Sequence, residues 1–156
     1  MTPDPLIEKK LGNLLRILAD NGLMQGDSAA RSILVAEDDG DLRAWLREVL
    51  ENEGYAVMEA ANGREAMEIV RRANVDLCIT DLAMPEQEGI ETIRMIRYEF
   101  PELKIITFSG TFGPEILRAS RILGASASLQ KPVDSATLLR TVQDVLAPSN
   151  LQVPQP

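Results

Sequence analysis

The segment Val75-Asp76-Leu77-Cys78-Ile79-Thr80 is an apolar run that ends at Asp81. A run of this length that is rich in β-branched residues is typical of a buried strand in a parallel sheet. Asp81 then lies at the carboxyl end of that strand, which is where open α/β sheets form their binding sites. This position predicts a chemical role for the carboxylate, and a turn-capping aspartate is the structural alternative.

Three further apolar runs also end in polar residues. Ile33-Leu34-Val35-Ala36 leads into Glu37-Asp38-Asp39, Ile105-Ile106-Thr107-Phe108 leads into Ser109-Gly110, and Ser126-Ala127-Ser128-Leu129-Gln130 leads into Lys131-Pro132. Because the carboxyl ends of parallel strands meet at one edge of the sheet, an acid cluster, a single acid, a hydroxyl and a lysine are expected together there. Such a set suits a divalent cation and a phosphoryl group.

From Ser32 onward, short apolar runs alternate five times with amphipathic stretches, which is typical of βα units in a parallel sheet. The pattern predicts strands at 32–37, 55–60, 75–80, 103–108 and 126–130, and helices at 40–53, 62–73, 87–99, 114–123 and 134–147. The second strand is the most polar and is expected at a sheet edge. We expect one domain at 32–147, a helical extension and linker at 1–31, and a disordered tail at 148–156.

Composition excludes several classes of function. With 16 Lys and Arg against 24 Asp and Glu, the net charge is −8, so direct binding to nucleic acid is not expected. No apolar span reaches membrane length and no signal peptide is recognisable, which predicts a soluble, cytoplasmic protein without membrane contact. The single cysteine, Cys78, is expected in the core. Histidine is absent, which excludes a histidine kinase, a histidine phosphotransfer protein and any imidazole-based catalysis.

The carboxylates of Glu37, Asp38 and Asp81 would repel one another at one sheet edge, and a hard cation with oxygen ligands relieves that repulsion. Mg²⁺ is the predicted cofactor, because it binds a few carboxylates, keeps waters and completes its shell with phosphate. A solvated cluster that complements the next helix dipole is the alternative for Glu37 and Asp38. We assign that structural role to Asp39 and Asp41, as capping and surface acids.

A metal-bound carboxylate in an exposed position can attack an activated phosphorus, and Asp81 is the predicted nucleophile. Ser109 could bond a phosphoryl oxygen, with Gly110 allowing close backbone approach, or it could simply form a turn at the strand end. Lys131 could pair with the phosphoryl charge, although exposed lysines are commonly just solvated.

Four motifs taken together resemble the receiver domain (REC, CheY-like) of two-component response regulators; they span residues 33–39, 80–85, 107–110 and 124–132. The resemblance covers about residues 32–147, and it is carried by the order and spacing of the motifs. It implies a flavodoxin-like, doubly wound α/β fold with a five-stranded parallel sheet of order 2-1-3-4-5 and five flanking helices.

The resemblance also implies roles for the acids. Asp81 becomes the phosphoacceptor, and Asp38 and the backbone carbonyl of Ala83 become direct Mg²⁺ ligands beside it. Glu37 becomes an acid that reaches the metal through water.

For switching, the resemblance assigns Ser109 as the hydroxyl that changes position on phosphorylation. Lys131 takes the place of the phosphate-pairing lysine, whose bond to Pro132 is commonly cis in such domains. The sequence departs from the family at Ser128, where an aromatic residue often reports phosphorylation.

The resulting hypothesis is a receiver that takes a phosphoryl group from a sensor histidine kinase or histidine phosphotransfer protein onto Asp81. Its 114–147 surface would then change and act on a downstream effector, with self-dephosphorylation as the most catalysis expected. An aspartyl phosphatase of the haloacid dehalogenase kind is one alternative. Such enzymes have a second acid two residues after the nucleophile, and this chain has Ala83 at that position. A phosphorylation-independent scaffold or dimerisation module is the other, and the intact site residues argue against it.

The N-terminal segment lies outside the resemblance. Its apolar residues recur at helical spacing, at Ile7, Leu11, Leu14, Leu15 and Leu18, and predict an amphipathic helix. That stripe needs a partner surface, because apolar area in water costs free energy. We consider three partners: the chain's own receiver core, a second copy in a homodimer through residues 6–20, and a kinase or effector.

Overall fold

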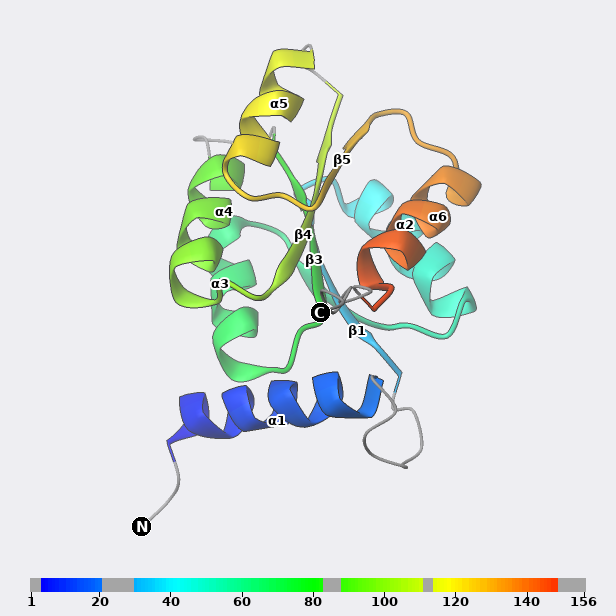
Figure 1. The fold of residues 1–156 in the computed structure, drawn as a ribbon. Helices are drawn as coiled ribbons and strands as arrows, with labels where there is room; N and C mark the ends of the chain where they lie inside the picture. Colours follow the sequence, from blue (N-terminus) through cyan, green and yellow to red (C-terminus); the bar gives the residue numbers. More distant parts are fainter. Residues whose placement is uncertain (1–3, 21–29, 83–87, 111–113, 149–156) are drawn as a thin grey trace, which may run out of the picture.

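A five-stranded parallel sheet forms the centre of the protein in a computed structural model, which describes residues 4–20, 30–82, 88–110 and 114–148 (Figure 1). The strands are β1 (Ser32–Ala36), β2 (Ala56–Ala60), β3 (Leu77–Asp81), β4 (Lys104–Ser109) and β5 (Ala127–Gln130). Their order is β2-β1-β3-β4-β5, which confirms the predicted topology and the edge position of β2. All four strand pairs are parallel, so the five carboxyl ends share one edge.

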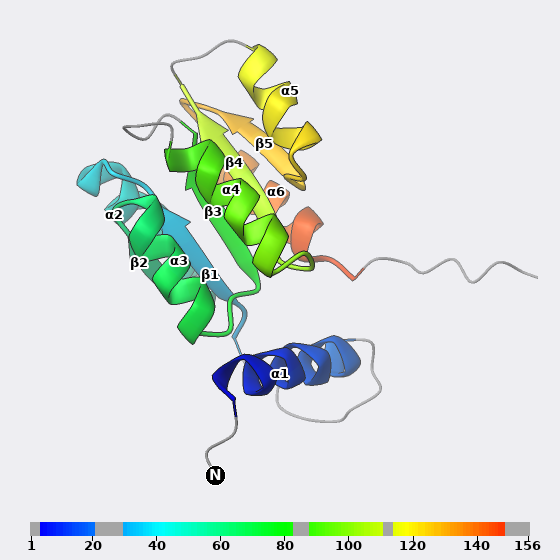
Figure 2. The same ribbon diagram turned by 90° about the vertical axis from the view of Figure 1, so that its left-hand side faces the viewer.

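Helices cover both faces of the sheet, as expected for a doubly wound fold (Figures 1 and 2). The described helices are α1 (Pro5–Asp20), α2 (Gly40–Asn52), α3 (Gly63–Arg72), α4 (Glu88–Glu99), α5 (Pro114–Ile122) and α6 (Ser135–Leu146). In Figure 1, α3, α4 and α5 lie on one face, and α2 and α6 lie on the other. The N-terminal helix α1 lies across the end of the sheet at which the strands begin.

Helix starts follow the capping residues of the sequence. Asp39 caps α2 by accepting hydrogen bonds from the backbone N–H groups of Asp41 and Leu42, at 3.0 and 3.3 Å. Asn62 caps α3 and Asp134 caps α6 in the same way. Satisfying these first N–H groups stabilises a helix by roughly 1 kcal/mol per cap. The expectation that Asp39 is a capping acid is therefore confirmed.

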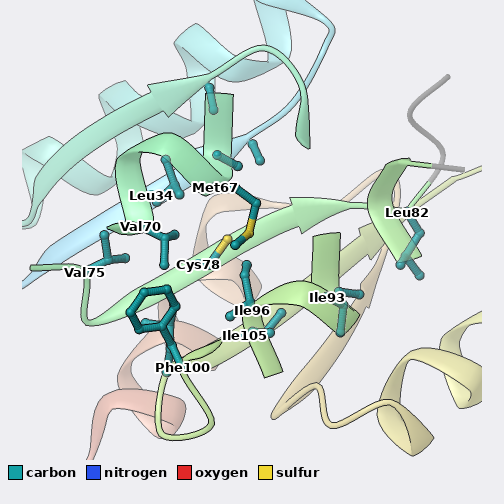
Figure 3. Packing of buried hydrophobic residues seen from close by; sticks show 14 residues of the cluster. Leu34, Met67, Val70, Val75, Cys78, Leu82, Ile93, Ile96, Phe100 and Ile105 are labelled. Carbon is teal, nitrogen blue, oxygen red and sulfur yellow. The ribbon is translucent and has the colours of Figure 1, made fainter. Parts of the chain in front are cut away.

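Alternate strand residues feed two separate apolar layers. Leu34, Cys78 and Ile105 point to the layer under α3 and α4, where Met67 and Phe100 join them (Figure 3). Their strand neighbours pack in the opposite layer against α2 and α6, and this set includes Ile33, Leu77, Ile79, Ile106 and Phe108. Because both faces of the sheet are covered, the strands read as continuous apolar runs.

Cys78 is fully buried, as predicted. Burial raises the pKa of its thiol to about 12, because the thiolate would lose its solvation in the apolar layer. This cysteine is therefore an unreactive core residue.

Two sequence-based boundaries shift at β3. The strand begins at Leu77 rather than at residue 75, and it includes Asp81, which pairs in register with Phe108 of β4. Asp76 precedes the strand, and its Oδ2 accepts hydrogen bonds from the backbone of Ser32 at 2.7 Å and from Arg16 of α1 at 2.6 Å. These polar contacts with β1 and α1 hold Asp76 at the start of the strand.

Candidate functional site

Three carboxylates converge at the carboxyl edge of the sheet. Glu37 follows β1 and is 1% exposed, Asp81 ends β3 and is 3% exposed, and Asp38 is exposed. One carboxylate oxygen from each residue lies within 4.8 Å of the other two. The strand-end positions inferred from the sequence therefore do bring these acids together. All the oxygens are hard ligands, which fits Mg²⁺ better than a soft transition metal.

Lys131 reaches into this acid cluster from the loop after β5. Its Nζ donates hydrogen bonds to Asp81 Oδ2 at 2.8 Å and to Glu37 Oε2 at 3.2 Å. It also lies 5.0 Å from the centre of the Phe108 ring. The peptide bond from Lys131 to Pro132 is cis, as the family resemblance implied.

The absence of a side chain at Gly110 leaves room for the Lys131 side chain to cross the edge of the sheet. A Cβ atom at position 110 would lie 2.9 Å from Lys131 Cβ and 3.2 Å from its Cδ, so a larger residue would displace the side chain. The backbone N–H of Lys131 also donates to the Ser109 carbonyl at 2.8 Å. The sequence predicted close approach to the backbone at Gly110, and the group that approaches it in the structure is the Lys131 side chain.

The electrostatics of the site follow from burial and close like charges. Burial is the main reason that the pKa of Glu37 is raised to about 7, and the carboxylates of Asp81 and Asp38 add to the shift against the opposing N–H of Asp39. Partial burial lowers the pKa of Lys131, but its hydrogen bonds and charge attraction to Asp81 and Glu37 raise it above the usual value overall. The lysine therefore carries a full positive charge beside two acids.

Ser109 lies at the end of β4, next to the strand that carries Asp81. It is fully buried, and its Oγ has no hydrogen-bond partner among the described residues. A buried hydroxyl without a partner costs roughly 1–3 kcal/mol, and functional groups are one reason for such exceptions. The Ser109 hydroxyl is therefore available to donate a hydrogen bond to an oxygen of a bound ligand.

Some residues that shape the site were not foreseen. Gly89, in the first turn of α4, packs directly on the backbone at the end of β3: a Cβ atom there would overlap the Asp81 carbonyl oxygen. Arg43 of α2 donates to the Glu37 carbonyl at 2.7 Å and pairs with Glu59 of β2 at 3.4 Å. A glycine near the start of an amphipathic run was the only sequence signal for Gly89, and nothing in the sequence singled out Arg43.

Ser128 belongs to a ring of three hydroxyls that also includes Thr107 and Ser120. Each pair of these hydroxyl oxygens is 2.9 Å apart. Thr107 and Ser128 face each other in register on β4 and β5, and Ser120 comes from α5. Where the family often carries an aromatic side chain, this chain therefore joins two strands and a helix by hydrogen bonds.

Ala83, the expected donor of a backbone carbonyl, lies outside the described residues. Asp39 and Asp41 are separate from the acid cluster, and Asp39 caps α2.

Within the described part of the chain, no helix is both long and apolar enough to cross a bilayer.

A doubly wound parallel sheet with clustered acids, a buried hydroxyl and a paired lysine at its carboxyl edge defines the receiver class of signalling domains. The response regulator receiver domain family matches residues 33–143, and the chain belongs to this family. The protein is thus a receiver in phosphorelay signal transduction.

Known proteins and structures agree with this assignment. The response regulator receiver protein CpdR of Brucella abortus is 34% identical over 74% of this chain and 97% of its own length. The CAI-1 autoinducer sensor kinase/phosphatase CqsS of Vibrio cholerae is 32% identical over 76% of this chain, which spans only 18% of that larger protein. The structure of the chemotaxis protein CheY4 of Vibrio cholerae superposes with a TM-score of 0.71 at 32% identity, covering 76% of this chain and all of CheY4.

Proposed function

We propose that Asp81 is the residue that accepts the phosphoryl group. The observation that carries this proposal is the contact set of its carboxylate: Oδ2 accepts from Lys131, and Glu37 and Asp38 lie beside it. In the proposed step, a carboxylate oxygen of Asp81 attacks the phosphorus of a donor phosphohistidine. The new P–O bond forms as the P–N bond breaks, and the imidazole nitrogen keeps the electron pair.

Glu37 and Asp38 are the proposed acids of a Mg²⁺ site that Asp81 and the carbonyl of Ala83 complete. Bound Mg²⁺ would supply positive charge to the phosphoryl oxygens during transfer. Asp38 is exposed and free to bind the metal directly, whereas both Glu37 carboxylate oxygens already accept hydrogen bonds, from the Asp39 N–H at 3.1 Å and from Lys131. This difference supports a water-mediated role for Glu37.

Lys131 and Ser109 are the proposed sensors of the phosphoryl group. Lys131 would exchange its contact with the Asp81 carboxylate for a phosphoryl oxygen, and the buried Ser109 hydroxyl would donate to another. Ser109 ends β4 and Lys131 directly follows β5. Both residues therefore adjoin the 114–147 surface, which we propose as the output surface toward a downstream effector.

The proposed partners are a sensor histidine kinase or a histidine phosphotransfer protein, a downstream effector and a second copy of this chain. The relatives support the first two, because they include a sensor kinase/phosphatase and a response regulator receiver protein. We propose a cytoplasmic receiver that performs no turnover beyond self-dephosphorylation. A phosphorylation-independent scaffold is less well supported, because the acids and lysine are in mutual contact.

Incubation with Mg²⁺ and a small phosphodonor, read by intact mass, tests this proposal. We expect the parent chain to gain the mass of one phosphoryl group and Asp81→Asn to gain none, because the amide is nearly isosteric but is a poor nucleophile. Asp41→Asn, which changes an acid outside the cluster, serves as the matched control and should still be labelled. Undiminished labelling of Asp81→Asn, with the label mapped to another residue, would overturn the assignment.

A further inference from the structure

The N-terminal helix α1 contacts the rest of the protein through its polar side. Lys9 is 7% exposed, and its Nζ lies 4.1 Å from the centre of the Phe100 ring. Arg16, two turns further along, pairs with Asp76 at 2.6 Å. Between them, a Cβ atom at Gly12 would lie 3.0 Å from Asn74, so the glycine allows close approach. Residues 9, 12 and 16 share one side of the helix.

The apolar side of α1 consequently faces away from the receiver. Leu6, Ile7, Leu11, Leu14, Leu15 and Ile17 are between 42% and 63% exposed. Six of the nine exposed large apolar side chains in the described part of the chain belong to this one helix, so they form a patch rather than a scatter. The first partner considered for the stripe, the chain's own core, is therefore wrong.

The size of this patch suits an interface. Burying one such side chain removes roughly 120 Å² of apolar surface, so six half-exposed ones present on the order of 350 Å² per copy. The largest apolar patch on a typical monomer is about 300–600 Å² and is often functional. Two such patches, with their polar margins, approach the roughly 1,000 Å² that a specific dimer requires.

The spacing of the patch indicates what covers it. Ile7, Leu11 and Leu14 of the patch, together with the half-buried Leu18, are separated by four, three and four residues, which is the alternation of a two-helix seam. A second helix with the same spacing complements this seam, and a second copy of α1 supplies it. Because the receiver body lies against the opposite side of α1, the bodies of two copies would lie on opposite sides of such a helix pair.

We infer that the apolar face of α1 is a homodimer interface, in which α1 of one copy packs against α1 of a second. The contact lies at the end of the sheet opposite Asp81. It rests on exposed apolar surface and helix geometry rather than on phosphorylation, so Asp81→Asn is expected to dimerise as the parent does.

Sedimentation velocity of the full chain across micromolar concentrations tests this inference. We expect the parent to be a dimer and Leu11→Glu/Leu14→Glu to be a monomer, because two buried charges per helix would lie in the seam. Tyr98→Glu/Ile122→Glu is the matched control: it also replaces two exposed apolar residues, but on α4 and α5, and should remain a dimer. Circular dichroism checks that each variant is folded.

A parent that stays monomeric throughout would overturn the inference, and so would dimers of Leu11→Glu/Leu14→Glu. Loss of the dimer in the Tyr98→Glu/Ile122→Glu control would move the interface away from α1. If the glutamates unfold α1, Leu11→Ala/Leu14→Ala keeps its helix propensity and should still raise the dimer Kd by about tenfold or more. An unchanged Kd in that variant contradicts the inference equally.

Discussion

Glu37, Asp38 and Asp81 illustrate how a site can oppose stability. Their carboxylate oxygens lie within 4.8 Å of one another, and burial together with this charge repulsion raises the pKa of Glu37 to about 7. Lys131 offsets part of the repulsion through two hydrogen bonds. Functional sites commonly lower the free energy of unfolding in this way, and a cation that binds only the folded state raises it again.

The two flanking acids should differ in their effect on Mg²⁺ binding. We expect Asp38→Asn to weaken binding by about tenfold or more and Glu37→Gln to weaken it less, because Glu37 already accepts two hydrogen bonds. Without metal, Asp38→Asn should melt at a higher temperature than the parent. Calorimetric titration and thermal unfolding measure both effects; equal or greater loss of affinity for Glu37→Gln would reverse the ranking.

Among the glycines that the structure describes, Gly89 should tolerate substitution least. A Cβ atom at this position would overlap the backbone carbonyl oxygen of Asp81, and backbone cannot move aside as a flexible side chain can. We expect Gly89→Ala to destabilise the protein by about 1–3 kcal/mol or more. Gly40→Ala is the control, since the nearest atom to its Cβ is 3.8 Å away, and it should be neutral or stabilising. Urea unfolding compares them, and equal stabilities would refute the packing argument.

At the scale of elements, β4 connects the acid cluster to α5. Ser109 ends the strand beside Asp81, and Thr107, two residues earlier, belongs to the hydroxyl ring with Ser120 and Ser128. In the proposed switch, a movement of β4 at Ser109 would alter this ring, which is hydrogen-bonded to α5 and β5. We propose these hydrogen bonds as the connection from Ser109 to the 114–147 surface, at the position where an aromatic residue is often found in the family.

Loss of the sensing residues should separate phosphorylation from switching. We expect Ser109→Ala and Lys131→Ala to leave Asp81 able to accept a phosphoryl group but to abolish most amide shift changes in residues 114–147. Nuclear magnetic resonance with and without a phosphoryl mimic reads this out, and Lys104→Ala, at the opposite end of β4, is the control. Shifts in the two variants that match those of the parent would locate the coupling elsewhere.

At the scale of the whole molecule, the two ends of the sheet carry different features. The acid cluster occupies the carboxyl edge, and α1 is fixed across the other end by Lys9 and Arg16 (Figure 2). Lys9 is 7% exposed, and its Nζ lies over the Phe100 ring with no hydrogen-bond partner among the described residues. Burial lowers the pKa of Lys9 to about 8, although Glu102 and Glu99 oppose the shift.

This lowered pKa predicts a stability that rises with pH. Between about pH 8 and pH 10.5, the unfolded chain binds a proton at Lys9 that the folded chain has released, so the free energy of unfolding increases across that window. Lys9→Met lacks the group, and the parent should therefore gain stability relative to this variant as the pH rises. Urea midpoints at several pH values measure the difference. Lys10→Met, which replaces the exposed neighbouring lysine, is the control, and its stability should depend on pH as that of the parent does. If the stability of Lys9→Met differed from that of the parent by the same amount at every pH, the prediction would be contradicted.

Local sequence determined the alternation of strands and helices, the caps and the approach of the strand-end residues. Strands that are buried on both faces appear in the sequence as continuous apolar runs, and parallel strands bring their carboxyl ends to one edge. The sequence alone therefore predicted that Asp81, Lys131 and Glu37 lie together, and the structure places them in contact. The division into residues 1–31, 32–147 and 148–156 stays a prediction.

Only the tertiary structure decided which side of α1 faces the receiver, why Gly89 must be small, and that Ser128 joins a hydroxyl ring. Periodicity identifies an apolar stripe but does not say which surface covers it, and here Phe100, Asn74 and Asp76 select the polar side instead. Contacts of this kind join residues that are distant in the chain, so they depend on how the elements pack, which no local pattern contains.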